Sequence, residues 1–145
     1  MVTKIINSLR FRLITIETKQ FALINTPKKG EEIKLESNIR FSADFNKHLI
    51  SVTPFFRYVG TGPLLQIEVA SVFQIEDESW QNLLDVENKL TIPKEVAQHF
   101  GALAVSTLRG ILYEKTSSGE RIILPLINLT KIITKDTVLK NNQNS

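Results

Sequence analysis

Apolar and polar residues alternate along much of the first half of the chain. Between Ile33 and Phe45 the odd-numbered positions are mostly apolar, and the even-numbered positions carry charged or polar side chains. The same period of two recurs from Leu65 to Ile75, where every odd position except Ser71 is apolar. A period of two turns one face of a strand towards the interior and the other towards water, which is typical of antiparallel sheets.

Two further segments have strand character but depart from a strict period. From Leu9 to about Lys19 the apolar positions change from odd to even, which predicts a β-bulge near Leu13. The segment from Leu49 to Val59 contains Pro54, which cannot donate to a ladder, so we expect this strand to lie at an edge or to bulge there. With no helical period between the four strands, their sheet is expected to be antiparallel.

The second half of the chain changes to helical periodicity. A short helix is expected from Asp77 to Val86, and a long one from about Ile92 to Lys115, with Thr91 as its N-cap. On the long helix the apolar and small residues fill an arc roughly 200° wide, which is more than packing on a sheet requires. A second subunit, a tail or a ligand is needed to cover the excess.

The end of the chain carries weaker signals. Residues 121–129 contain Pro125 and are expected to form a packed extended segment or an edge, and residues 130–139 a last amphipathic turn or helix. Residues 136–145 are expected to form a polar, frayed tail. The prediction is therefore one α+β domain over residues 1–145, with a short and a long helix packed on one face of a four-stranded antiparallel sheet.

Composition excludes several classes of protein. The apolar content of 42% suits a globular domain, and the absence of cysteine excludes disulfides and thiolate sites. Neither a signal-peptide core nor a run of about 18 apolar residues is present, so a cytoplasmic protein is expected. The basic pI of about 9.2 leaves a nucleic-acid-binding α/β module as an alternative, although the basic residues are scattered and not interleaved with aromatic ones.

The sequence offers no catalytic apparatus. His48 and His99 lack metal-ligand spacing, and the acidic residues 76–78 suit the start of a helix better than a carboxylate site. Phosphate-binding loops and nucleophile elbows are absent. We therefore expect no enzyme activity, catalytic residue, metal or cofactor.

Aromatic residues gather in two successive strands, where they serve either as core or as a surface that binds other chains. Five of them form this group: Phe41, Phe45, Phe55, Phe56 and Tyr58.

Several stretches, in this order, resemble the SecB family of protein-export chaperones. They are Ile16–Phe21, Ile33–Leu35, Glu68–Ile75, Ser106–Gly110 and Leu124–Leu129, and the resemblance spans about residues 9–133. It implies an ATP-independent holding chaperone that forms a homotetramer, a dimer of dimers with long helices between two sheets. For the long helix this implies interface residues Ala97, Gly101, Ala104 and Leu108.

The resemblance also implies grooves that bind unfolded or precursor polypeptides. The residues expected to line them are Phe41, Phe45, Phe55, Phe56, Tyr58, Leu112, Tyr113 and Ile127.

The chain departs from the family where export SecB offers carboxylates to the translocation motor SecA. Glu68 matches one of those carboxylates and is an expected SecA-type contact together with Gln20, but Gln20 and Ile24 stand where the family pattern is acidic. Two roles therefore stay open, delivery of precursors for export through SecA and service to one dedicated client such as an antitoxin.

Overall fold

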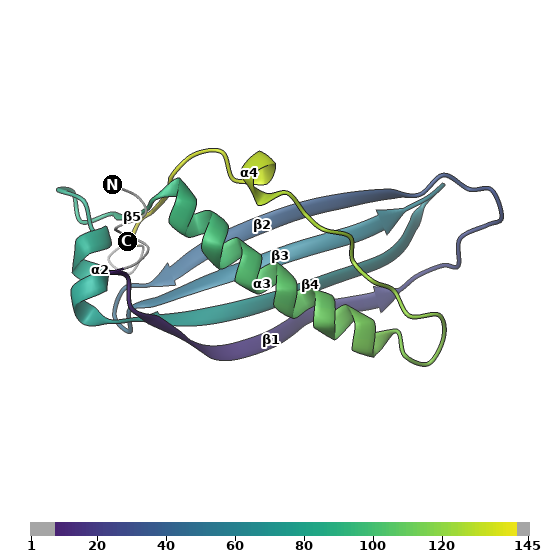
Figure 1. Cartoon of the computed structure of the whole chain (residues 1–145), viewed down its shortest axis with the longest axis horizontal. Helices are drawn as coiled ribbons and strands as arrows, with labels where there is room; N and C mark the ends of the chain where they lie inside the picture. Colours follow the sequence, from purple (N-terminus) through teal and green to yellow (C-terminus); the bar gives the residue numbers. More distant parts are fainter. Residues whose placement is uncertain (1–7, 142–145) are drawn as a thin grey trace.

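The computed structural model describes residues 8–141. Four strands form one antiparallel sheet: β1 (Phe11–Leu23), β2 (Lys34–Asp44), β3 (Leu49–Val59) and β4 (Pro63–Ile75). Their order in the sheet is β1-β4-β3-β2, so β1 and β2 are the edges (Figure 1). The four strands expected from the sequence are confirmed, as is their antiparallel pairing.

The phase change in the first strand corresponds to a real irregularity. The pairing of β1 with β4 shifts register between Leu13 and Thr15, as predicted, and shifts again between Thr18 and Gln20. Each inserted residue restores the apolar face and adds twist, which explains why simple alternation fails in this strand.

The expectation for Pro54 is wrong, because β3 is an interior strand and its register with β4 is not shifted at this residue. β2 pairs with β3 continuously through Pro54, whereas the pairing of β3 with β4 is interrupted at Thr53 and Pro54. The sheet thus accommodates the missing N–H as a local gap in one ladder.

Two helices follow the sheet, α2 (Asp77–Leu83) and α3 (Lys94–Lys115), and α3 lies diagonally across β3 and β4 on one face (Figure 1). Thr91 is not the N-cap of α3. That position is Pro93, which offers no side-chain acceptor, and the backbone N–H of Lys94 instead donates to Asp136 Oδ1 at 2.8 Å. A residue distant in sequence therefore caps the long helix.

After α3 the chain turns back along the helix. Residues 121–128, which we call the strap, have no regular secondary structure and lead to the short helix α4 (Leu129–Ile132). Strand β6 (Thr137–Leu139) then pairs antiparallel with β5 (Leu90–Ile92). The predicted frayed tail is thus wrong for residues 136–139, which are held by these contacts; residues 142–145 lie outside the described part.

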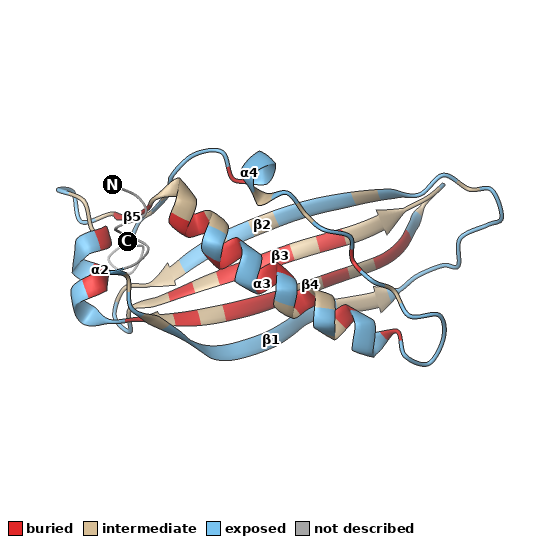
Figure 2. Ribbon diagram, viewed as in Figure 1, coloured by how far each residue is buried: buried red, intermediate tan, exposed pale blue. Residues whose placement is uncertain are grey.

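The core lies between the sheet and the helices in two clusters (Figure 2). One surrounds Trp80 and Phe100 near α2, and the other surrounds Phe56 and Leu108 near the opposite end of α3. Among the described residues, one buried side-chain oxygen, Ser71 Oγ, has no hydrogen-bond partner. Within residues 8–141 no helix covers the other face of the sheet, which we call the uncovered face (Figure 1).

Candidate functional site

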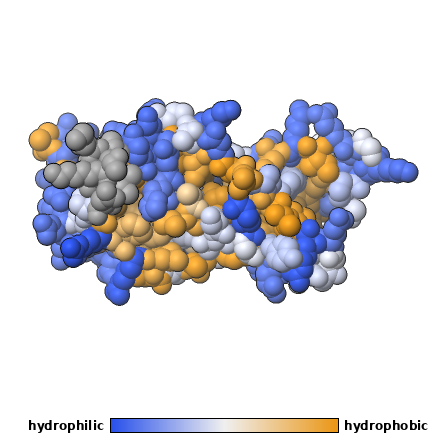
Figure 3. Space-filling view, viewed as in Figure 1, coloured by the Kyte–Doolittle hydropathy of each residue, from blue (hydrophilic) through white to orange (hydrophobic). Residues whose placement is uncertain are grey.

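An apolar pocket of about 630 Å³ opens at the end of the sheet where α3 finishes. Three parts of the chain form it: the β1–β2 loop, the adjoining ends of β3 and β4, and residues 120–123 at the start of the strap. Side chains that are large and apolar yet exposed surround it, and Figure 3 shows apolar surface at this end of the molecule. They are Leu23, Ile24, Ile33 and Ile123, with 60%, 41%, 45% and 68% of their surface exposed.

Local hydrogen bonds hold the walls of this pocket in place. The backbone N–H groups of Ile24 and Asn25 both donate to the carbonyl of Leu64, at 2.7 and 3.1 Å, which ties the β1–β2 loop to β4. On the other wall, the Ile122 N–H donates to Thr116 Oγ1 at 2.9 Å. The pocket is therefore formed before any ligand binds.

Polar groups in the pocket are few. Burial raises the pKa of the Tyr58 phenol above its ordinary value, so this side chain stays neutral and can donate a hydrogen bond. Glu120 and Arg121 lie at the rim, and the Arg121 guanidinium stacks over the ring of Tyr113 with a distance of 4.5 Å to its centroid. An apolar lining with a few polar groups suits an apolar side chain attached to a hydrogen-bonding backbone.

The structure separates the residues that the sequence assigned to client binding. Phe56 and Leu112 are fully buried core residues. Phe41 and Phe45 pack on the other core cluster, where the ring of Phe45 meets Trp80 edge-on. These four do not meet at one surface.

The other predicted client residues lie nearer the pocket, with one exception. Tyr58 lines it, Tyr113 borders it through Arg121, and Ile127 packs from the strap onto the second core cluster. Phe55 is the exception, since it lies on the uncovered face of the sheet beneath Arg57.

Sequence reasoning missed the β1–β2 loop. The signal was present in Ile24, a large apolar residue in an otherwise polar connection that includes Pro27 and Gly30. Such residues in a loop have no strand or helix period to explain them.

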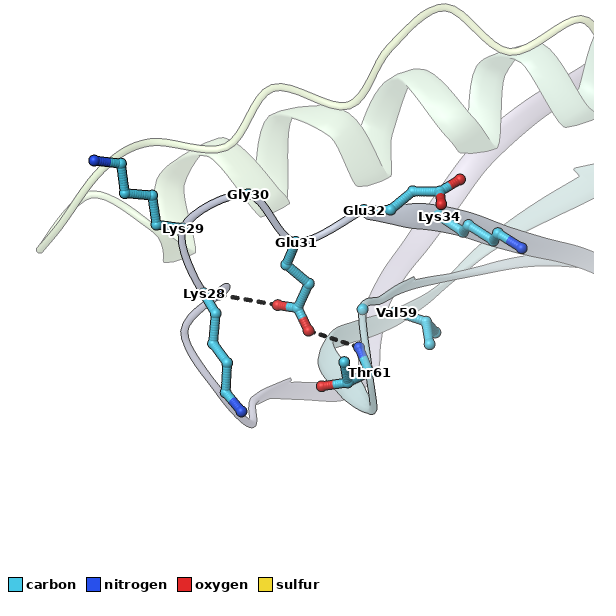
Figure 4. A pocket seen from close by; sticks show the side chains of 9 residues that line it. Lys28, Lys29, Gly30, Glu31, Glu32, Lys34, Val59 and Thr61 are labelled. Carbon is cyan, nitrogen blue, oxygen red and sulfur yellow. Dashed lines mark hydrogen bonds between the residues drawn. The ribbon is translucent and has the colours of Figure 1, made fainter.

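Next to this pocket the same loop lines a second, polar one of about 620 Å³ (Figure 4). The Glu31 carboxylate accepts hydrogen bonds from the backbone N–H groups of Thr61, at 2.6 Å, and Lys28, at 2.9 Å. The Thr61 hydrogen bond, followed by that of Lys28, holds the pKa of Glu31 below its ordinary value. Glu31 thus fastens the loop to the β3–β4 turn.

The two residues assigned to a SecA-type partner are brought together. Gln20 and Glu68 are register partners in β1 and β4, and they share the uncovered face with Arg40. Glu68 is already engaged, because its Oε2 accepts from Arg40 Nη2 at 2.9 Å. Its charge is therefore compensated by a neighbour on the same face.

The four residues assigned to a subunit interface are buried inside this chain. Ala97, Ala104 and Leu108 have no exposed surface, and a Cβ atom on Gly101 would lie 3.2 Å from Ile133 Cδ1. The wide apolar arc of α3 is thus covered by the sheet and by the chain's own C-terminal segment. As an interface these residues stay a prediction that requires this segment to move.

The described residues, 8–141, offer neither a metal site nor a membrane-spanning helix. They contain no group of three or more His, Asp or Glu side chains placed to hold a metal ion. Their helices include none with the length and apolar character needed to span a bilayer.

No protein-family model matches the chain, and no curated protein matches it. Among solved structures, the Mycobacterium tuberculosis SecB-like chaperone Rv1957, in complex with a ChAD peptide from the Rv1956 HigA1 antitoxin, is similar over 82% of this chain and 91% of that one. The TM-score is 0.51 and the identity 17%. A Streptococcus agalactiae protein of unknown function matches 82% of this chain and 99% of its own at 8% identity, with a TM-score of only 0.39. The four-stranded antiparallel sheet with its helices, together with the first of these comparisons, shows that the chain has a SecB-like fold.

Proposed function

We propose that this protein is an ATP-independent holding chaperone that binds apolar segments of unfolded polypeptides at the pocket between the β1–β2 loop and the strap. The exposed apolar rim of this pocket carries the proposal, because large side chains left in water at a concave site mark an interaction surface. The SecB-like neighbour, which was solved with a peptide bound, supports polypeptide as the ligand. Apolar burial is not directional, so the pocket should accept any apolar segment in vitro, whichever client it serves in the cell.

The test is suppression of the aggregation of a chemically unfolded protein in the absence of ATP. Ile24→Asp and Ile123→Asp place a charge on the rim at positions that are already exposed, so the fold should survive while protection is lost. Val86→Asp is the matched control, since Val86 is fully exposed and does not line the pocket. Full protection by both rim variants would refute the site.

We further propose that the clients are few and dedicated, as with an antitoxin, and that the protein works in the cytoplasm. The pairing of Glu68 with Arg40 supports this choice over export through SecA, because it offsets the one carboxylate that matches the export pattern. A pull-down from native cytosol separates the two roles. One dominant client would support the dedicated role, and mixed precursors together with SecA would refute it.

The proposal includes a homotetramer, and the exposed side of α3 supports it. From His99 to Tyr113 its exposed positions carry no charge, and they include Ala102, Leu103, Ser106 and Gly110. Beside it, edge strand β1 exposes Leu13 and Ile16, at 45% and 47%. Uncharged helical surface next to an unpaired strand edge suits a second copy of the chain.

Light scattering tests this assembly. Ser106→Arg adds a charge to the exposed row without entering the core, so we expect a smaller species with an unchanged circular dichroism spectrum. A wild-type mass for this variant would contradict the assignment of the surface.

A further inference from the structure

The strap, residues 121–128, binds the rest of the molecule as a docked peptide would. Leu124 anchors it with only 1% of its surface exposed, whereas Leu126, two residues further on, is 93% exposed. It runs back along α3 on the same face of the sheet, towards α4 above β2 (Figure 1). A segment without regular secondary structure that buries one leucine in a cluster formed by strands and a helix resembles a docked peptide with a single apolar anchor.

Side chains and not a backbone ladder hold the strap. Arg109 of α3 donates from Nε to the carbonyl of Leu124 at 3.0 Å and from Nη2 to the carbonyl of Pro125 at 3.1 Å. Within residues 8–141 no backbone group of the strap from 121 to 127 pairs with a strand. A segment held by a few side chains and one buried leucine can leave without unfolding the sheet.

The surface under the strap is the apolar face of β2 and β3. The core cluster that contains Leu124 also contains Phe56 of β3, and the side chains packed on it include Leu35 and Ile39 of β2 and Ile127 of the strap. This strand face is continuous with the pocket through Tyr58, which packs on the cluster and lines the pocket. The strap therefore covers the part of the sheet that would otherwise extend the pocket into a groove.

We propose that the strap is an internal occupant of the client site, and that an unfolded apolar segment gains the face of β2 and β3 by displacing it. The inference rests on the proposed function and adds its regulation. A client first meets the open pocket and then exchanges with residues 121–128, which have the same chemistry. Until then the strap keeps this apolar face out of water.

Displacement predicts the direction of a mutational effect. If a client must first displace the strap, the apparent dissociation constant is raised by the population in which the strap is docked. Weakening the anchors of the strap then tightens client binding. If the strap is only a wall of the site, the same change removes contacts and weakens binding.

Leu124→Ala is the main variant, and Leu126→Ala is the matched control, because both shorten the same side chain in the same segment but only Leu124 is buried. Arg109→Gln is a second variant that releases the carbonyls of Leu124 and Pro125 and leaves the apolar core intact. Circular dichroism checks that each variant is folded. Binding is measured by fluorescence anisotropy with labelled, reduced and carboxymethylated lactalbumin as a permanently unfolded probe.

We expect Leu124→Ala to bind the probe about tenfold more tightly, Arg109→Gln to change in the same direction, and Leu126→Ala to match the wild type. A synthetic peptide of residues 121–129 should compete with the probe. The same peptide with the substitution Ile127→Asp should not compete, because Ile127 packs on the same core cluster as Leu124. If the wild type binds the probe but neither anchor variant binds it more tightly, the strap is not displaced by the client. The proposed function stands in that case. Failure of the wild type and every variant to bind would overturn the proposed function and the inference with it.

Discussion

The cap of the long helix makes a prediction that can be worked out from one contact. Asp136 Oδ1 accepts the Lys94 N–H at 2.8 Å, across 42 residues of sequence. Loss of a side-chain N-cap destabilises a protein by about 1 kcal/mol, within a range of roughly 0.5–2 kcal/mol. For a domain of this size that corresponds to a fall in the melting temperature of roughly 3–4 °C. Asp136→Ala should show this fall in thermal unfolding followed by circular dichroism.

Asp136→Asn separates the cap from the charge. Asparagine caps helices about as well as aspartate, so this variant should keep most of the stability, and any loss then measures the interaction of the carboxylate with the helix dipole. Amide exchange should rise in the first turn of α3 for Asp136→Ala only. A melting temperature equal to that of the wild type in Asp136→Ala, or equal losses in both variants, would refute the capping role.

Three further predictions concern single side chains. Ser71→Ala should raise the free energy of unfolding by about 1 kcal/mol in a urea titration, because Ser71 Oγ is buried without a partner; a fall would show that the hydroxyl is satisfied. Ala104→Glu should abolish the helical signal, because this position is fully buried and cannot hold a carboxylate; a folded variant would contradict the packing of α3. Glu31→Gln should melt below the wild type at pH 7, and the gap should shrink as the pH falls below the ordinary carboxyl pKa of 4.5, since a carboxylate with a lowered pKa loses its contribution there; a gap that does not depend on pH would refute the role of the charge.

The sheet could be predicted because its signals are local. Alternation in β2 and β4 and the phase change near Leu13 depend on side chains a few residues apart. Alternation predicts a strand with one buried face, and the phase change predicts a bulge. The start of α3 was placed two residues early, since the cap that decides it, Asp136, lies at the other end of the chain. Pro54 led to the wrong prediction of an edge strand or a bulge. An interior strand can lose a hydrogen bond to one neighbouring strand when its pairing with the other neighbour continues.

The candidate site was harder to predict because it depends on which distant segments meet. The aromatic residues of β2 and β3 form a group in sequence, yet alternation sends Phe55 to the uncovered face and Phe56 into the core. The pocket instead joins the β1–β2 loop to the strap, which are about 100 residues apart by number. The wide arc of α3 correctly indicated a covering element, but only the structure shows that the chain itself supplies it.

The uncovered face of the sheet bears on the choice between export and a dedicated client. Three arginines on this face each have an acceptor on another strand. Arg40 Nη2 lies 2.9 Å from Glu68 Oε2, and Arg57 Nη1 lies 3.7 Å from Glu36 Oε1. Arg12 donates to the side-chain oxygen of Gln74. Exposed pairs of this kind add little stability, but they cancel the field that a row of free carboxylates would create. A basic partner would therefore find no negative platform here. Under the proposed function, the binding surface then reduces to the apolar pocket and the strand face beneath the strap, and we expect a client to be selected there by its apolar side chains and not by its charge.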